Sequence, residues 1–203
     1  MNDATEPINL NVVPWHIHDR FVEIQSRWLT VIGEHLQDHQ GNHLEYWRVE
    51  KADSVIVIPI QDQQFLLPQP SYRPGVGQAM LDFPGGRLPA GADLRETACD
   101  ILYRELGIPR TAIASLEALN SQGWAINSSF SNQRLYGWVA EITADSDWNP
   151  AQSDSPILRY SIDARGVRSL LQDLTCLQCR SVLQEWYLTT RISERISDGE
   201  VIS

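Results

Sequence analysis

The fold is decided by residues 83–108, which read FPGGRLPAGADLRETACDILYRELGI. Proline and glycine crowd the first nine residues of this stretch, a composition typical of a loop. Asp93 stands three residues before Glu96, which is the spacing of a capping box at a helix N-terminus. Gly107 supplies the residue type that ends helices in the left-handed conformation. The sequence therefore predicts a loop followed by a helix from Asp93 to about residue 106.

Strand-forming segments lie on both sides of this loop and helix. Residues 54–60 read SVIVIPI, and a run that is apolar on both faces predicts a central, buried strand. Residues 27–32 and 44–49 are rich in strand formers, and turn residues at 40–42 join them into an antiparallel hairpin. The remaining pattern predicts strands near residues 65–67, 114–119 and 133–142 and helices near 163–171 and 176–192.

Composition limits the function classes. The chain of 203 residues carries 16 Lys and Arg against 26 Asp and Glu, a net charge of −10, with no basic cluster. Binding to nucleic acid depends on Lys and Arg that neutralise phosphates, so no nucleic-acid partner is expected. No run approaches the ~20 apolar residues of a membrane helix, and residues 1–10 lack the basic and apolar parts of a signal peptide. We therefore expect a cytoplasmic protein without a membrane partner.

The cysteines form an odd set of three: Cys99, Cys176 and Cys179. An odd number argues against a disulfide framework. The Cys176-x-x-Cys179 pair has the spacing of a zinc or redox motif, but a structural zinc site needs four ligands and no second pair exists. Because the pair falls in an amphipathic helical pattern, we interpret both residues as small buried side chains.

The decisive stretch resembles the signature of Nudix hydrolases, G-x5-E-x7-R-E-U-x-E-E-x-G-U, where U is aliphatic. With the first glycine at Gly86, the last falls on Gly107 without a gap. The loop around Tyr72 and Arg73, and the loop at 128–133 before a strand, resemble the ADP-ribose and ADP-sugar pyrophosphatase branch. This resemblance covers roughly residues 25–175. It implies an α/β fold, the Nudix α/β/α sandwich with a mixed sheet, an N-terminal antiparallel hairpin and C-terminal helices.

The resemblance also implies a division of the chain. In this branch the hairpin commonly builds a homodimer, and it lies on the side of the substrate. We expect a mobile leader at 1–20, the N-terminal β-hairpin at 21–53, the Nudix core at 54–160 and C-terminal helices at 161–203.

Nudix enzymes use water and divalent metals to cleave a nucleoside diphosphate linked to another group, and glutamates of the signature helix hold the metals. This chain departs from that pattern. The first signature glutamate is Ala92, and the three clustered metal positions are Ile101, Arg104 and Glu105. Gln133 stands where this branch usually has an acidic residue. The resemblance therefore implies a protein that keeps a pocket for a nucleoside-diphosphate-linked small molecule and has weak or no hydrolysis.

Two carboxylates remain that would support an alternative, an active hydrolase with a reduced metal site. Glu105 keeps the catalytic and metal position of the signature, and Asp82 stands where the branch often has a glutamate before Pro-Gly. Mg²⁺ retains much of its water shell, so these two groups and the phosphates would suffice for an active enzyme with a reduced site for Mg²⁺ or Mn²⁺. Without hydrolysis, no cofactor is implied. The resemblance assigns substrate binding to Arg48, Tyr72, Arg73, Gly85 and Gly86.

A third alternative is a dimeric protein-interaction module with a vestigial pocket. Trp28 and Trp47 are candidates for stacking on a base, but we assign both to packing in the core or in a dimer interface. On the signature helix, Asp100 and Arg104 are four residues apart, which predicts an ion pair on the helix surface.

Overall fold

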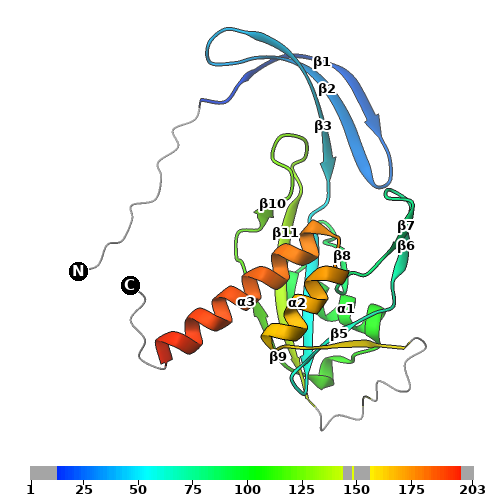
Figure 1. Cartoon of the computed structure of the whole chain (residues 1–203). Coiled ribbons are helices and arrows are strands. Elements are labelled where there is room, and N and C mark those ends of the chain that lie inside the picture. Colours follow the sequence, from blue (N-terminus) through cyan, green and yellow to red (C-terminus); the bar gives the residue numbers. More distant parts are fainter. Residues whose placement is uncertain (1–12, 144–147, 149–155, 198–203) are drawn as a thin grey trace. The chain divides into compact units, whose positions relative to one another are not determined.

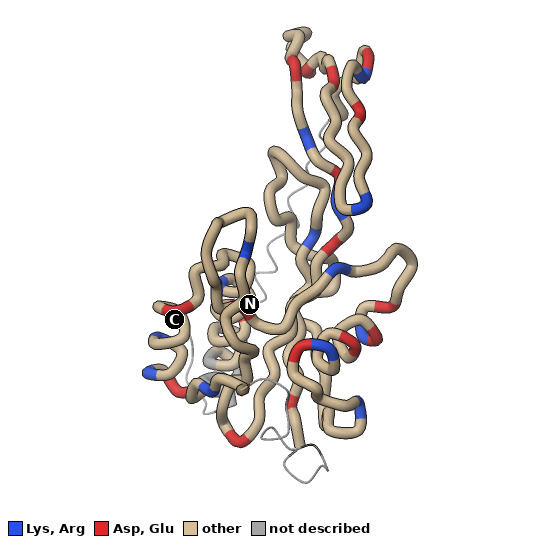
Figure 2. The backbone as a smooth tube through the Cα atoms, turned by 90° about the vertical axis from the view of Figure 1, so that its right-hand side faces the viewer, with Lys and Arg blue, Asp and Glu red and all other residues tan. Residues whose placement is uncertain are grey.

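The structure is a computed structural model that describes residues 13–143, 148 and 156–197. The contacts divide it into two units. The first contains the described residues up to Lys51 and the segment Asn127–Asn132; the second contains Ala52–Ile126 and the described residues from Gln133 onward. Acidic and basic positions are interspersed along the chain (Figure 2). No helix in the described ranges is long and apolar enough to span a membrane.

The first unit is a three-stranded antiparallel sheet in the order β1-β2-β3. The predicted hairpin is confirmed, although both of its strands are longer than expected. The sheet also holds a third strand, half of which falls in the expected leader, since residues 16–20 pair with β2. Alternating polar and apolar residues in this segment favour a strand once a partner edge is available. The strands are β1 (His16–Gln25), β2 (Leu29–Gln37) and β3 (His43–Lys51).

The turn between β2 and β3 and the segment 127–132 complete the first unit. Gly41 adopts a φ of 86° in that turn, which glycine tolerates without strain. The backbone N–H of Val49 donates to the carbonyl oxygen of Phe130 at 2.8 Å, and the N–H of Lys51 donates to Asn132 Oδ1 at 2.9 Å. The predicted loop before the last long strand is thereby tied to the end of β3.

The second unit is a mixed sheet around β4 (Ser54–Gln61), the predicted central strand. β4 runs parallel to β11 (Arg134–Ile142) and antiparallel to β5 (Gln64–Leu67) and β8 (Gly85–Arg87). The main order is β10-β11-β4-β5-β12, and β9 pairs with β11. The other strands are β9 (Ile113–Ala118), β10 (Trp124–Ala125) and β12 (Leu158–Ser161).

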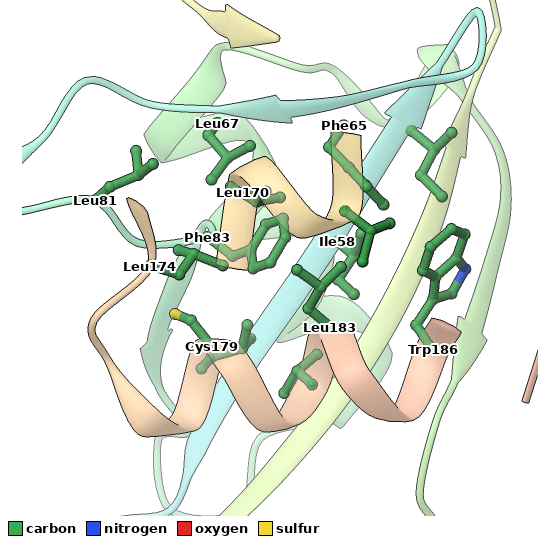
Figure 3. Packing of buried hydrophobic residues seen from close by; sticks show 14 of the residues in the cluster. Ile58, Phe65, Leu67, Leu81, Phe83, Leu170, Leu174, Cys179, Leu183 and Trp186 are labelled. Carbon is green, nitrogen blue, oxygen red and sulfur yellow. The ribbon is translucent and has the colours of Figure 1, made fainter. Parts of the chain in front are cut away.

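Helices cover both faces of this sheet (Figure 1). Side chains of β4 alternate between the faces, so Val55 and Val57 pack against α1 (Leu94–Leu106). Ile56 and Ile58 pack on the opposite face against α2 (Ala164–Asp173) and α3 (Leu177–Ser197), as Figure 3 shows for Ile58. Both faces of β4 are buried, which explains its continuous apolar run. The predicted α/β/α sandwich is confirmed.

Helix α1 begins and ends as its capping residues predict. The Asp93 side chain accepts a hydrogen bond from the N–H of Glu96 at 2.9 Å, and Gly107 adopts a φ of 69°. The predicted ion pair of Asp100 with Arg104 is wrong. Arg110, in the turn after the helix, instead binds both Glu96 and Asp100. A guanidinium approaching from outside the helix can reach two carboxylates that lie one turn apart.

The segment 69–92, where the glycine and proline content and the resemblance indicate loops, contains short strands. β6 (Ser71–Arg73) pairs antiparallel with β7 (Gln78–Met80), and the carbonyl of Arg73 accepts two hydrogen bonds within the connecting turn. Tyr72 and Arg73 therefore lie on a strand of a small hairpin. Pro and Gly are concentrated in the turns of this segment, where they mask the short strand pattern between them.

Candidate functional site

A cavity of about 270 Å³ opens in the second unit, beside the first residues of β4. The loop before β8, β8 itself, the end of β6 and the first turn of α3 form its other walls. Four residues that the sequence singled out line it together with two cysteines: Arg73, Asp82, Gly85, Gly86, Cys176 and Cys179. The fold thus brings together residues that are separated by about a hundred positions in the chain.

Arg73 and Asp82 form an ion pair in the wall of this cavity. Nε and Nη2 of Arg73 lie 2.8 and 2.7 Å from the same oxygen, Oδ2 of Asp82. Asp82 is largely buried and Arg73 is half exposed, so the carboxylate is held in the wall and the guanidinium reaches the opening. Within the described ranges Nη1 of Arg73 makes no hydrogen bond, which leaves one donor edge for a ligand.

The face of α1 that carries the metal glutamates in the Nudix signature is differently built here. Ile101 is 1% exposed and belongs to the core cluster between α1 and the sheet. Arg104 donates from Nη2 to the carbonyl oxygen of Gly85 at 3.0 Å. Its Nε and Nη2 also lie 3.0 and 2.9 Å from Oε1 of Glu105. A Cβ atom on Gly86 would approach Arg104 Nη2 to 2.9 Å, so these side chains closely cover the glycine loop.

These residues do not fit a magnesium cluster. Mg²⁺ requires oxygen ligands, and several converging carboxylates are needed to hold it against a diphosphate. Glu105 is engaged by Arg104, and Asp82 is engaged by Arg73. Among the described residues, the only group of three or more His, Cys, Asp or Glu side chains close enough to share an ion is that of Asp82 with the two cysteines.

Gln133 immediately precedes β11 and is almost fully buried. Its Nε2 donates to the carbonyl oxygen of Ala52 at 2.9 Å and to Ser54 Oγ at 2.8 Å. These bonds attach the beginning of β11 to the beginning of β4. In this chain the amide is therefore part of the structural frame beside the cavity.

The other predicted residues are not among those that line the cavity. Arg48 belongs to the first unit, where it binds Glu34 and Glu50. Tyr72 is 65% exposed and is not among the cavity-lining residues. Trp28 and Trp47, which we assigned to a core or a dimer interface, are 61% and 44% exposed in the described chain, so the core assignment is wrong for both.

The two cysteines are the site residues that the sequence interpretation missed. One side-chain ligand atom of each of Asp82, Cys176 and Cys179 lies within 4.8 Å of the others. The nearby side chain of Cys179 is the largest influence on Cys176, and together with the backbone of Cys179 and Gln178 it lowers the pKa of Cys176 to about 6. The same contact with Cys176, followed by burial, raises the pKa of Cys179. The signal in the sequence was the Cys176-x-x-Cys179 motif at the beginning of the predicted C-terminal helix.

No protein-family model matches the sequence, and none of the curated proteins matches it. Solved structures do match, 182 chains in all. One of them is described as "Crystal structure of ADP compounds hydrolase". It superposes with a TM-score of 0.70 at 21% identity, covering 91% of this chain and 98% of that chain. At this identity the likeness shows a shared fold over nearly the whole length of both proteins.

Proposed function

We propose that this protein binds a nucleoside-diphosphate-linked small molecule in the cavity beside β4 and hydrolyses it weakly or not at all. The shared fold with an ADP compounds hydrolase supports the ligand class. A cavity of about 270 Å³ has room for the diphosphate and part of what is attached to it. The Nudix resemblance of the glycine loop and α1 supports the same location.

The observation that carries the loss of hydrolysis is the position of Arg104. Its guanidinium lies between the carbonyl oxygen of Gly85 and the carboxylate of Glu105, so a cation of the protein is held beside the one signature carboxylate that remains. A Mg²⁺ or Mn²⁺ ion at Glu105 would have to displace that guanidinium. Without clustered metal charge, the negative diphosphate continues to repel a hydroxide nucleophile. The pKa of the attacking water also stays high, so little hydroxide forms.

Arg73 is the group we assign to the diphosphate. An arginine binds phosphate oxygens through a planar fork, and this one lines the cavity with an unused donor edge. Asp82 holds the guanidinium in place from the buried side. The backbone of Gly85 and Gly86 lies on the same wall and, lacking side chains, allows a ligand to approach the chain closely.

We also propose that the first unit mediates a homodimer, as the resemblance implies. Exposed apolar side chains on β1 and the following turn support this, because a monomer rarely exposes many large apolar groups on one small sheet. Sedimentation velocity of the full chain tests it, and a monomer at micromolar concentration would contradict it. The exposed side chains are Ile17, Phe21, Ile24 and Trp28.

The central experiment is a calorimetric titration of the full chain with ADP-ribose, with and without Mg²⁺ or Mn²⁺. The same mixtures are then assayed for AMP. We expect heat of binding without release of AMP. Release of AMP at ordinary enzyme rates would overturn the loss of hydrolysis and favour the active enzyme with a reduced metal site. No heat and no AMP would overturn ligand binding and favour an interaction module.

A further inference from the structure

Two sulfur atoms lie in the cavity wall, and the proposed function uses neither of them. Cys176 immediately precedes α3, and Cys179 is in the first turn of that helix. Their Sγ atoms lie within 4.8 Å of each other and of a carboxylate oxygen of Asp82. Residues three apart at the start of a helix point to the same side, so rotation about the Cys side-chain bonds can bring the two sulfurs into bonding distance.

The surroundings of Cys176 favour its thiolate form. Interaction with the Cys179 side chain, and then with the backbone of Cys179 and Gln178 at the N-terminus of α3, lowers the pKa of Cys176. The helix spans 21 residues and carries no acidic residue in its first turn, so the positive end of its dipole faces the sulfur. Cys176 is partly exposed and lines the cavity. A thiolate that solvent can reach at a helix N-terminus is the reactive kind of cysteine.

Cys179 has the opposite surroundings. It is 2% exposed and packs in the core cluster between α3 and the sheet (Figure 3). Its Sγ lies 3.6 Å from Oδ1 of Asp82, so the thiol donates to a carboxylate that can take its proton. At 2% exposure, Cys179 is much less accessible to an external reagent than Cys176, but it can react with a mixed disulfide formed on Cys176. The pair therefore divides into an attacking cysteine and a resolving cysteine.

We propose that Cys176 and Cys179 form a redox-active dithiol that low-molecular-weight disulfides oxidise to an intramolecular disulfide. The Cys176 thiolate attacks one sulfur of R–S–S–R, so that a mixed disulfide forms and one RS⁻ leaves to take a proton from solvent. Asp82 accepts the proton of Cys179, whose sulfur attacks Sγ of Cys176, breaks the mixed disulfide and releases the second RS⁻. This RS⁻ takes the proton back from Asp82 and leaves as a thiol. Overall the two cysteines lose two electrons and two protons, and the external disulfide becomes two thiols.

The same three side chains would also be donors to a soft cation such as Zn²⁺, but the redox reading fits better. Oδ2 of Asp82 already binds the guanidinium of Arg73 at 2.7 Å, so a dication at Asp82 would lie close to a positive charge. Structural zinc sites use four protein ligands, and among the residues that the structure describes only three such side chains converge here. Zinc binding is accordingly one outcome that the test must separate.

The reduced full chain, freed of metal, is equilibrated with mixtures of reduced and oxidised glutathione, quenched with acid and alkylated. Intact mass spectrometry should reveal a species that has lost two hydrogen atoms and carries no glutathione. Peptide mapping should place the bond between Cys176 and Cys179, with Cys99 alkylated. A disulfide that involves Cys99 or joins two chains, or a Cys176 that reacts no faster than Cys99, would overturn the proposal.

Three variants sharpen the result. Cys179→Ser should stop at the mixed disulfide and keep one glutathione on Cys176, while Cys176→Ser should slow the oxidation of the chain by at least about tenfold. Cys99→Ser is the matched control and should behave as the wild type does. Thermal unfolding checks that each variant folds. If Cys179→Ser does not fold, the comparison of the wild type with Cys176→Ser still tests whether oxidation proceeds through Cys176.

Zinc is tested separately by titrating Zn²⁺ alone into the reduced chain with a chromophoric chelator as competitor. We expect weak binding that leaves oxidation by glutathione unchanged. Tight, equimolar binding that requires both Cys176 and Cys179 and blocks their oxidation would overturn the redox proposal in favour of a metal site.

Discussion

Arg104 donates a hydrogen bond from Nη2 to the carbonyl oxygen of Gly85 at 3.0 Å, joining α1 to β8. The same guanidinium binds the carboxylate of Glu105. In the Nudix signature this helix position carries a glutamate that points toward the metal. In this chain the Arg104 guanidinium joins the helix to the glycine loop, at the place where the resemblance implies a bound metal ion.

Replacing Arg104 with glutamate should create affinity for a divalent cation. The change removes the guanidinium and places a second carboxylate beside Glu105, near the carbonyl oxygen of Gly85, and all three are oxygen ligands of the kind that hard cations prefer. We expect excess Mn²⁺ to raise the Tm of Arg104→Glu but not that of the wild type. Differential scanning fluorimetry measures this shift.

Arg104→Ala is the control for that experiment, because it loses the same contacts without adding a carboxylate. Equal stabilisation of Arg104→Ala and Arg104→Glu by Mn²⁺ would mean that the cation binds elsewhere. Absence of any shift in folded Arg104→Glu would contradict the alignment of α1 with the signature.

Arg73→Ala should weaken binding of ADP-ribose by about tenfold or more, because a charge-assisted hydrogen bond to a phosphate is worth roughly 1.5 to 3 kcal/mol. Arg73→Lys keeps the charge but not the planar fork, so an intermediate affinity is expected. Calorimetric titration measures all three proteins under the same conditions.

Arg159→Ala is the matched control for Arg73, since Arg159 binds Gln61 and Gln64 outside the cavity. It should leave the affinity unchanged. Equal losses in the two variants would show that overall charge, and not the cavity, governs binding. Asp82→Asn separates direct contact from positioning, because it releases the Arg73 guanidinium without removing it.

The sequence was sufficient wherever structure depends on local chemistry. Helix α1 starts at Asp93 and ends at Gly107 because capping satisfies backbone groups within a few residues. The central strand β4 was recognisable because burial on both faces leaves a continuous apolar run. The packing of α1 on one face of the sheet, and of α2 and α3 on the other, then follows because both faces of β4 are apolar.

The sequence was insufficient where a contact joins distant segments. Asp100 and Arg104 have the spacing of a pair, yet Arg110 from the next turn binds Asp100. The cysteine motif was visible, but Cys179 and Asp82 are 97 residues apart, and only the folded chain places them together. Spacing along a helix indicates which partners are possible, and competition from neighbouring segments decides among them.

Glu34 makes the stability of the first unit depend on pH. Its side chain is 2% exposed, and its carboxylate oxygens lie 2.9 Å from Arg20 Nη2 and 3.0 Å from Arg48 Nε. Hydrogen bonds from Arg48, then from Arg20, hold the pKa of Glu34 below its ordinary value of 4.5. A carboxyl whose pKa is lowered by folding stabilises the folded state above that ordinary value, and this contribution disappears as pH falls through the lowered pKa.

We therefore expect Glu34→Gln to lower the free energy of unfolding by about 1 to 3 kcal/mol at about pH 7 and by less at about pH 4. Urea unfolding at both values measures the difference. Glu23→Gln is the control, because Glu23 is half exposed and binds only Arg20 among the described residues, so its loss should cost less than about 0.5 kcal/mol. A cost of Glu34→Gln that does not change with pH would contradict the assigned role of the carboxylate.

Gly33, in the middle of β2, lies beneath two aromatic rings from the neighbouring strands. A Cβ atom there would come within 2.8 Å of the ring of Phe21 and 3.3 Å of the ring of Trp47, and these rings already pack edge to face with centroids 5.4 Å apart. Gly33→Ala should therefore displace the pair and destabilise the sheet by about 1 to 3 kcal/mol, as overpacking does. Gly75→Ala is the control, because no described atom lies within 4 Å of a Cβ at that position. Urea unfolding followed by tryptophan fluorescence compares the two variants. Equal stabilities would show that the packing of the two rings does not require the absence of a side chain at position 33.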